Sequence, residues 1–248
     1  MPSRPPPPNS DITVAILAGG LGTRLHSVVS DRPKVLAPVG NRPFLAWWLE
    51  ALEGQGFRDV ILCTGFRAAQ VEEAFGMSFG KLKLRYSAED TPLGTGGAVH
   101  KALPMTRSST LLVLNGDSFC QQTLRPFIVH HFEHGWRASL VVTSVPDAGR
   151  FGSVQFNPEG KVQRFQEKPG QSGPGWINAG IYLLSRELFS VLPAHMSISL
   201  ERDLLPRWLH QDLHVFSSLG RFLDIGTPES LSAATEFFLG QPQPMAAA

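Results

Sequence analysis

The segment from Leu17 to Pro38 constrains this chain more than any other part of its sequence. It reads LAGGLGTRLHSVVSDRPKVLAP and follows an apolar run, residues 12–17, that is typical of a buried strand. Glycines let the backbone approach a ligand closely and turn its N–H groups toward it, which suits a polyphosphate. We therefore expect a phosphate-binding loop at the end of the first strand.

Two basic residues support phosphate binding by this loop. Arg24 lies just beyond the glycines and Lys34 follows ten residues later, so two cations can balance charge that N–H groups alone cannot. The loop lacks the Gly-Lys-Ser/Thr ending of a P-loop, and its glycine spacing differs from the dinucleotide-binding fingerprint. The alternative is an ordinary tight turn after a strand. The candidate nucleotide-binding residues here are Leu17, Ala18, Gly19, Gly20, Gly22 and Thr23.

Composition and charge exclude several classes of function. The 248 residues carry a formal net charge of +1 and no basic run, so nothing favours nucleic acid or an anionic membrane as a partner. The two cysteines are too few for a disulfide framework, and no apolar stretch approaches the roughly 20 residues of a membrane span. The Pro-rich N-terminus lacks the apolar core of a secretory signal, so a cytoplasmic location is the default expectation.

Apolar runs and amphipathic stretches alternate along the first half of the chain. We expect strands at residues 12–17, 59–64, 81–87 and 110–114, and helices at residues 43–52, 68–75 and 97–103. This order predicts an α/β fold with a doubly wound, mostly parallel sheet. A single domain is expected over residues 11–239, between a disordered Pro-rich arm at 1–10 and a flexible tail at 240–248.

The middle of the chain changes character. Strand-like runs at residues 138–143, 152–156, 162–167 and 177–184 are separated by turns rather than by long helices. They predict a small antiparallel addition covering one side of the nucleotide-binding half. Closing helices are expected at residues 203–210 and 228–238, the second with Thr227 and Pro228 as cap and first-turn residues.

Two aspartates stand out because each follows an apolar, strand-like run. Ligands of open α/β sheets bind beyond the carboxyl ends of the strands, and Asp117 follows such an end in Asn115-Gly116-Asp117. Mg²⁺ prefers few carboxylates together with phosphate oxygens, so Asp117 predicts a metal site against a triphosphate. Asp224 precedes the last expected helix. For each residue the alternative is an ordinary turn or capping aspartate.

The motifs together resemble the signature of the sugar-1-phosphate nucleotidyltransferases, the enzymes that form NDP-sugars. The family pattern of two glycines, Gly-Thr-Arg-Leu, Pro-Lys and Leu-x-Pro occurs here at residues 19–20, 22–25, 33–34 and 36–38. The resemblance covers about residues 11–238 and implies a Rossmann-like, GT-A-like fold. It implies that Asp117 and Asp224 jointly hold Mg²⁺, and that Arg24 and Lys34 stabilise the phosphates during catalysis.

The resemblance assigns base recognition to the segment EDTPLGTGGA, residues 89–98. The family residue that pairs with the base lies five positions before Gly94 and is Glu89 here, while Gly94 and Thr95 belong to the same nucleotide-binding loop. Guanine offers two donors that a carboxylate can accept, whereas the carbonyl groups of uracil and thymine would repel it. Glu89 therefore favours GTP, with an exposed loop acid as the alternative.

The sugar phosphate is expected at two further family motifs, Glu167-Lys168-Pro169 and Asn178-Ala179-Gly180. By the resemblance, Glu167 and Asn178 hydrogen-bond sugar hydroxyl groups, Lys168 neutralises the sugar phosphate, and Gly152 lets the backbone approach the sugar. Taken singly, an Asn near a Gly or a Lys before a Pro is usually turn chemistry. Only the ordered set of motifs carries the functional interpretation.

The implied reaction transfers a nucleotidyl group, favoured as GMP from GTP, to a sugar 1-phosphate by Mg²⁺-assisted in-line displacement. The attacking phosphate is already anionic, so no strong general base is required. Within the family, the length and residues 93–98 and 222–231 are most similar to D-glycero-α-D-manno-heptose 1-phosphate guanylyltransferases. Mannose 1-phosphate guanylyltransferases, N-acetylmuramate 1-phosphate uridylyltransferases and a catalytically silent nucleotide-sugar sensor are the alternatives. The sequence leaves monomer and homodimer equally open.

Overall fold

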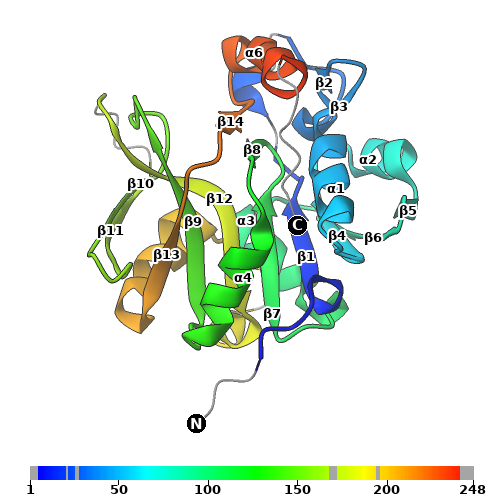
Figure 1. The fold of residues 1–248 in the computed structure, drawn as a ribbon. Coiled ribbons are helices and arrows are strands. Elements are labelled where there is room, and N and C mark those ends of the chain that lie inside the picture. The colour runs from blue at the N-terminus through cyan, green and yellow to red at the C-terminus, as the bar shows by residue number, and fades with distance from the viewer. Residues whose placement is uncertain (1–4, 21, 26–27, 168–171, 194–195, 241–248) are drawn as a thin grey trace.

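A mixed sheet of ten strands forms the frame of the described part of the molecule (Figure 1). The computed structural model describes residues 5–20, 22–25, 28–167, 172–193 and 196–240. The sheet has the order β11-β10-β12-β7-β1-β4-β6-β5, and β9 pairs with both β12 and β13. Its strands are β1 (Thr13–Leu17), β4 (Asp59–Thr64), β5 (Ser78–Phe79), β6 (Leu82–Ala88), β7 (Thr110–Asn115), β9 (Ala138–Val145), β10 (Ser153–Phe156), β11 (Val162–Gln166), β12 (Gly175–Ser185) and β13 (Leu213–Ser218).

The centre of the sheet is parallel, as the strand–helix alternation predicted. β1 pairs in parallel with β4 and β7, and its last residue, Leu17, lies opposite Cys63 and Asn115. The three strands therefore end at one edge of the sheet, where their loops meet. The predicted α/β fold class, with a mostly parallel sheet and an antiparallel addition, is confirmed.

Helices cover both faces of the sheet and bury two apolar clusters. They are α1 (Phe44–Gly54), α2 (Ala68–Phe75), α3 (Gly94–Ala102), α4 (Leu124–Glu133), α5 (Leu205–Trp208) and α6 (Pro228–Leu239). Side chains of β1 alternate between the clusters: Val14 and Ile16 pack with α1 and α4, and Ala15 packs with α3 and α5. Thr227 caps α6 and Pro228 opens it, as predicted.

The antiparallel strands extend the sheet and do not form a separate layer over it. β12 pairs antiparallel with β7 along one stretch and with β9 along most of its length. Its register shifts between Asn178 and Tyr182, where Gly180 has a φ of +73°. A bulge of this kind bends the strand and turns its side chains toward a new direction. Figure 1 shows β9–β13 on the side opposite α1 and α2.

Several elements differ from the sequence expectations. The helix expected at 203–210 begins earlier, with a π-helix at Leu200–Leu204 followed by α5, because the Ser199 side chain accepts from Arg202 N and caps the turn. The short ladders β8 (Ser118–Cys120) with β14 (Phe222–Asp224), and β2 (Pro38–Val39) with β3 (Arg42–Pro43), were not predicted. Their brevity leaves no periodic pattern to detect.

The N-terminal arm packs on the domain over the part that the structure describes. Asn9–Asp11 form a 3₁₀ turn, and the Asn9 side chain donates to the carbonyl group of Gln55 at 2.8 Å. Arg125 of α4 donates to the carbonyl group of Pro7. These bonds join described residues of the predicted arm, 1–10, to the domain, and residues 241–248 of the tail predicted at 240–248 lie outside the described residues.

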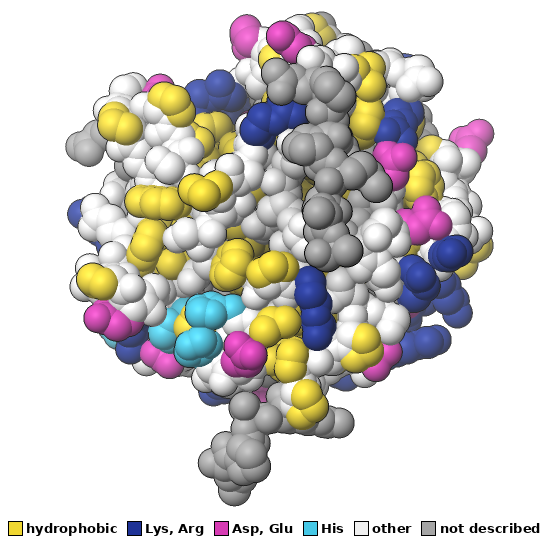
Figure 2. Space-filling model, in the orientation of Figure 1, with side chains coloured by type: hydrophobic (Ala, Val, Ile, Leu, Met, Phe, Trp, Pro, Cys, Tyr) yellow, Lys and Arg dark blue, Asp and Glu magenta, His cyan; other side chains and the backbone are white. Residues whose placement is uncertain are grey.

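Histidine side chains gather on the face shown in Figure 2, in the region where α4 and β13 lie in Figure 1. The rings of His130 and His134 lie 4.3 Å apart, and the ring of His214 stacks on that of Trp136 at 4.2 Å. None of these residues lines the large cavity described below. Among the residues described, no helix is both long and apolar enough to cross a membrane.

Candidate active site

A cavity of about 1050 Å³ opens at the carboxyl ends of β1, β4 and β7, where ligand binding was predicted. It continues to the antiparallel strands. The predicted site residues that line it are Leu17, Ala18, Gly19, Gly20, Gly22, Thr23, Arg24, Lys34, Glu89, Gly94, Thr95, Asp117, Gly152, Glu167, Asn178 and Asp224. Lys168, predicted to neutralise the sugar phosphate, lies outside the described residues. The structure thus brings the other predicted residues into one cavity.

The three glycines of the loop after β1 have different surroundings. Gly19 packs against the loop after β4, and an added Cβ would lie 3.1 Å from the nitrogen of Gly65. Gly22 has a φ of +61°, and its Cβ would lie 3.2 Å from that of Lys34. Gly20 faces open space, with no atom within 4 Å of an added Cβ. Gly20 is therefore the position at which a ligand can approach the backbone closely.

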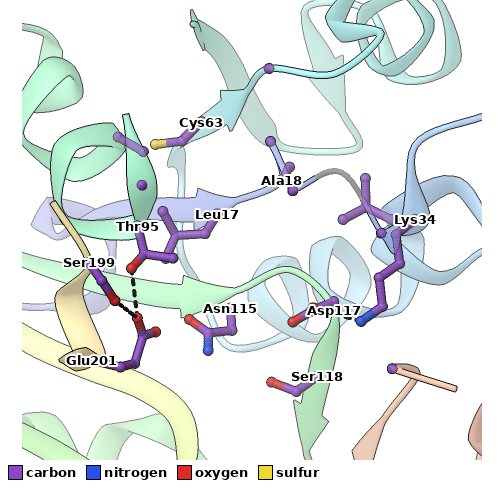
Figure 3. A pocket seen from close by; sticks show the side chains of 18 of the residues that line it. Leu17, Ala18, Lys34, Cys63, Thr95, Asn115, Asp117, Ser118, Ser199 and Glu201 are labelled. Atoms are coloured by element: carbon purple, nitrogen blue, oxygen red, sulfur yellow. Dashed lines mark hydrogen bonds and ion pairs between the residues drawn. The ribbon is translucent and has the colours of Figure 1, made fainter. Parts of the chain in front are cut away.

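Lys34 and Asp117 form an ion pair in the cavity lining. Nζ of Lys34 donates to Oδ2 of Asp117 at 2.7 Å, and the side chains are 9% and 41% exposed, respectively. Figure 3 shows the lysine extended toward the aspartate at the end of β7. A buried cation is thereby held in place beside a carboxylate that remains accessible to a ligand.

The unpredicted β8–β14 ladder places Asp224 beside Asp117. Asp224 lies opposite Ser118 in this ladder, and Ile225 N donates to the carbonyl group of Asp117 at 3.0 Å. Trp48 of α1 anchors the ladder, because its Nε1 donates to the carbonyl group of Ser118 at 2.6 Å. Two aspartates that are remote in sequence therefore face the same cavity.

The pKa values of the two aspartates are shifted in opposite directions. Burial acts to raise the pKa of Asp117, but the Lys34 and Arg24 cations outweigh burial and hold that pKa below its usual value. Burial raises the pKa of Asp224, and the Asp117 charge adds to this shift against the attraction of Lys34. Two carboxylates that repel each other across a cavity form a site that a bound cation stabilises.

Glu89 begins the loop that was predicted to read the base. Its N–H donates to the carbonyl group of Thr64 at 2.8 Å, which ties the loop to the end of β4. Its Oε2 accepts from Leu93 N at 2.9 Å, and burial raises the pKa of its carboxyl group. An ionised carboxylate offers about four lone-pair sites, so Glu89 can hold the loop and still accept from a ligand.

Gly152, Glu167 and Asn178 lie together at the antiparallel end of the cavity. An added Cβ on Gly152 would lie 2.9 Å from Oε2 of Glu167 and 3.6 Å from the Cβ of Asn178. The Asn178 side chain accepts from Gly180 N at 3.0 Å and donates to the Tyr182 hydroxyl at 2.7 Å. Asn178 can therefore offer a ligand one remaining amide hydrogen and one remaining lone pair.

Comparison with known proteins identifies the family. The model of the family described as nucleotidyl transferase matches residues 13–241. The chain belongs to the nucleotidyl transferase family. The resemblance drawn from the sequence motifs is thereby confirmed, as is the prediction that the chain is an enzyme of this class.

Two relatives and one solved structure illustrate the similarity. The D-glycero-alpha-D-manno-heptose 1-phosphate guanylyltransferase of Aneurinibacillus thermoaerophilus is 36% identical over 220 residues, covering 88% of this chain and 95% of that protein. The mannose-1-phosphate guanylyltransferase catalytic subunit beta of Drosophila melanogaster is 34% identical over 86% of this chain, which spans only 59% of that protein. The crystal structure of HddC from Yersinia pseudotuberculosis complexed with GMP-PN has a TM-score of 0.81, with 34% identity over 92% of this chain and 99% of that one.

This nucleotidyl transferase has cavity residues that sequence analysis did not single out. Arg150 lies 3.9 Å from Oδ1 of Asp224, and its place before Phe151-Gly152 was an available signal. Ser199 and Glu201 reach the cavity from the start of the π-helix, and the hydroxyl groups of Ser199 and Thr95 both donate to the Glu201 carboxylate (Figure 3). No local pattern distinguishes Glu201 from an exposed helical acid, so sequence alone could not have found it.

The donor set of the nucleotidyl transferase cavity fits a hard cation shared with phosphate. Within the described ranges, no group of three or more His, Cys, Asp or Glu side chains could hold a metal ion. Asp117 and Asp224 supply carboxylate oxygens alone, and Mg²⁺ is commonly held by one or two carboxylates plus substrate phosphates. The described residues therefore fit a divalent cation that arrives together with a triphosphate.

Proposed function

We propose that this nucleotidyl transferase moves GMP from GTP to a sugar 1-phosphate, forming a GDP-sugar and releasing pyrophosphate. The observation that carries the proposal is the single cavity that joins the cationic glycine loop to the Gly152, Glu167 and Asn178 cluster. A nucleotide and a sugar phosphate bound at its two ends would meet beside Lys34 and the aspartate pair. The names of the relatives, which are guanylyltransferases of sugar phosphates, support the same reaction.

The residues act in this proposal by positioning and by neutralising charge. Gly20 lets the backbone approach the triphosphate, and Arg24 balances the departing pyrophosphate. Lys34, held by Asp117, stabilises the negative charge on the α-phosphate oxygens. The sugar phosphate attacks as an anion in line with the leaving group, so the reaction depends on alignment of the two substrates and on neutralisation of their charge.

Asp117 and Asp224 hold Mg²⁺ in this proposal. Members of the family generally use a divalent metal, and the carboxylate pair fits such an ion. When bound, the ion would neutralise phosphate charge and orient the reacting groups. Lys34 shares Asp117, so the lysine keeps this carboxylate ionised and ready for the metal. Lys168 remains a proposed ligand of the sugar phosphate from the sequence motif alone.

Guanine is the proposed base because a carboxylate stands at the base-reading position. Glu89 can accept from the N1–H and amino groups of guanine with lone pairs that Leu93 N does not occupy. The sugar is proposed to be a D-glycero-α-D-manno-heptose, because the relative of that name matches nearly the full length of both chains. Mannose is the second candidate, supported by the mannose enzyme that the chain matches over 59% of its length.

A matrix of substrates tests the proposal. GTP, ATP, UTP and dTTP are each combined with the heptose, mannose and N-acetylmuramate 1-phosphates in the presence of Mg²⁺, and pyrophosphate release is measured. We expect the highest kcat/KM with GTP and the heptose phosphate, and loss of turnover with chelator. A preference for UTP or dTTP would reject the role of Glu89. Calorimetric binding of GTP without pyrophosphate from any pair would instead identify a silent sensor.

A further inference from the structure

A chain of hydrogen bonds links the base-reading loop to the sugar end of the cavity. Glu201 is its centre: Thr95 Oγ1 donates to Oε2 at 2.6 Å, and Ser199 Oγ donates to the same oxygen at 3.2 Å (Figure 3). The Tyr182 hydroxyl donates to Oε1 at 3.3 Å and accepts from Asn178 Nδ2 at 2.7 Å. One carboxylate thus connects the first turn of α3 with β12.

The segment around Glu201 also packs directly against the backbone of the base-reading loop. Gly96 N and Gly97 N both donate to the carbonyl group of Ile198, at 2.9 and 3.1 Å, and Ile198 N donates to Leu93 O at 2.8 Å. An added Cβ on Gly94 would lie 2.6 Å from the Ile198 carbonyl oxygen. The glycines of this loop therefore allow its backbone to pack closely against residues 196–204. This contact fixes the position of the loop.

Tyr182 has a hydroxyl group that packing does not explain. Its side chain is fully buried on β12, and it does not line the cavity, so it cannot contact a substrate. A buried hydroxyl group destabilises the fold unless it forms hydrogen bonds that replace those it made with water. The two hydrogen-bond partners of the Tyr182 hydroxyl, Asn178 and Glu201, both line the cavity. From its buried position outside the cavity, Tyr182 thus connects two residues that line the cavity.

We propose that Glu201 is a positioning residue through which nucleotide binding and sugar 1-phosphate binding strengthen each other, with Tyr182 as the link. A nucleotide that orders Glu89 and Thr95 fixes the orientation of the Glu201 carboxylate. The Tyr182 hydroxyl then holds the Asn178 amide in the rotamer that meets the sugar. This inference rests on the proposed function, and by linkage the sugar phosphate must favour nucleotide binding by the same factor.

The Thr95–Glu201 pair has the geometry of a fixed connection. Thr95 Oγ1 accepts a hydrogen bond from Leu200 N at 2.8 Å and donates its own hydrogen to Glu201. The Thr95 hydroxyl cannot rotate away from Glu201 without losing a hydrogen bond. The amide of a glutamine at position 201 would present a donor to one of these hydroxyl groups. Preordering of one ligand site by the other lowers the conformational cost of the second binding event.

Tyr182→Phe tests the inference, because it removes the link and leaves both ligand-facing residues in place. Calorimetry with Mg²⁺ gives the Kd of the preferred sugar 1-phosphate with and without α,β-methylene GTP, and the ratio is the coupling factor. We expect a wild-type factor of at least about fivefold and a Tyr182→Phe factor within about twofold of one. The Kd for nucleotide alone should change less than about twofold, because Glu89 and Thr95 are retained.

The matched control is Tyr86→Phe, since Tyr86 and Tyr182 are the two tyrosines of the chain. Tyr86 donates to the carbonyl group of Gly76 outside the cavity, so its removal should leave the coupling factor at the wild-type value. If Tyr182→Phe fails to fold, Glu201→Gln is measured in the same way and should also lose the coupling.

The outcomes separate this inference from the proposed function. Wild-type protein that releases no pyrophosphate overturns the proposed function, and the inference with it. Wild-type turnover with a coupling factor near one, or with the same factor in Tyr182→Phe, overturns the inference alone. A loss of thermal stability in Tyr182→Phe with unchanged coupling assigns Tyr182 a purely structural role and also overturns it.

Discussion

The proposed nucleotide end and the proposed sugar end of the cavity are built from strands that are connected in different ways. At the nucleotide end, parallel strands β1, β4 and β7 stop at one edge, and Gly20 and Asp117 follow β1 and β7 within a few positions. At the sugar end, Asn178 and Glu167 depend on a bulged strand and on antiparallel neighbours. Local sequence therefore specifies the first end, and long-range pairing specifies the second.

The difference predicts how substitutions at the two ends should act. A charged residue on a short loop after a parallel strand can be replaced with little effect on packing, so its loss should reduce catalysis alone. A residue inside the bulge of β12 contributes both to packing of the fold and to the shape of the site, so its substitution should reduce stability and substrate affinity together.

Asp117→Asn should have the largest effect and should spare the fold. It removes the partner of Lys34 and one proposed Mg²⁺ ligand, so kcat/KM should fall about 10³-fold, with a thermal midpoint within about 2 °C of wild type. Pyrophosphate release and calorimetric unfolding measure the two quantities. Asp212→Asn is the control, because Asp212 pairs with Lys161 on the surface and its φ of 75° suits asparagine. Activity of Asp117→Asn within twofold of the control would reject a metal role.

Gly180→Ala should instead destabilise the fold and weaken sugar binding together. Gly180 has a φ of +73°, and a Cβ would lie 2.8 Å from Ser118 Oγ and 2.9 Å from the Cβ of Asn115. We expect a loss of about 3 kcal/mol in the free energy of unfolding, from backbone strain plus the clash, and a raised KM for the sugar phosphate. Denaturant unfolding and initial rates measure the two effects.

Gly135→Ala separates backbone strain from the clash. Gly135 has a φ of +66°, but nothing lies within 4 Å of an added Cβ, so about 1 kcal/mol of strain is expected without any change in KM. Equal unfolding free energies for Gly180→Ala and Gly135→Ala would show that the close approach of Ser118 to position 180 adds no cost to a side chain there. The sugar end would then be no more sensitive to packing than an exposed turn.

Glu89→Gln should change base preference by a smaller factor. A glutamine loses one acceptor for guanine and gains a donor for the carbonyl groups of pyrimidines, so the GTP-to-UTP ratio of kcat/KM should fall roughly 30-fold. The loop should keep its place, because the glutamine carbonyl oxygen can still accept from Leu93 N. An unchanged ratio would mean that the base is read elsewhere in the cavity.

The sequence was sufficient to predict the site residues that lie in the same short segment as the strand that positions them. Gly20 and Asp117 were located because each follows an apolar strand whose end defines the ligand edge, and Arg24 and Lys34 were located from their spacing after the glycines. Their grouping with Asp224 was expected from the family resemblance, but the β8–β14 ladder that achieves it is too short to show a pattern. The bond of Thr95 to Glu201 joins residues 106 positions apart, and no local signal marks it.

The smallest effect is expected outside the cavity, in the helix that covers β9. His131 of α4 is buried and bonds to Ser139 at 2.7 Å, and burial lowers its pKa to about 4, with the positive charge of His214 adding to the shift. The unfolded chain binds a proton near pH 6.5 and the folded chain does not, so stability is full above that pH and is lost as the pH falls toward about 4. Between pH 7 and 5.5 the loss should be about 1 kcal/mol, measured by denaturant unfolding. His131→Gln should remove this dependence of stability on pH, whereas the control His210→Gln, at an exposed position, should retain it. If His131→Gln retains the dependence, the acid sensitivity comes from other groups, the cavity carboxylates among them.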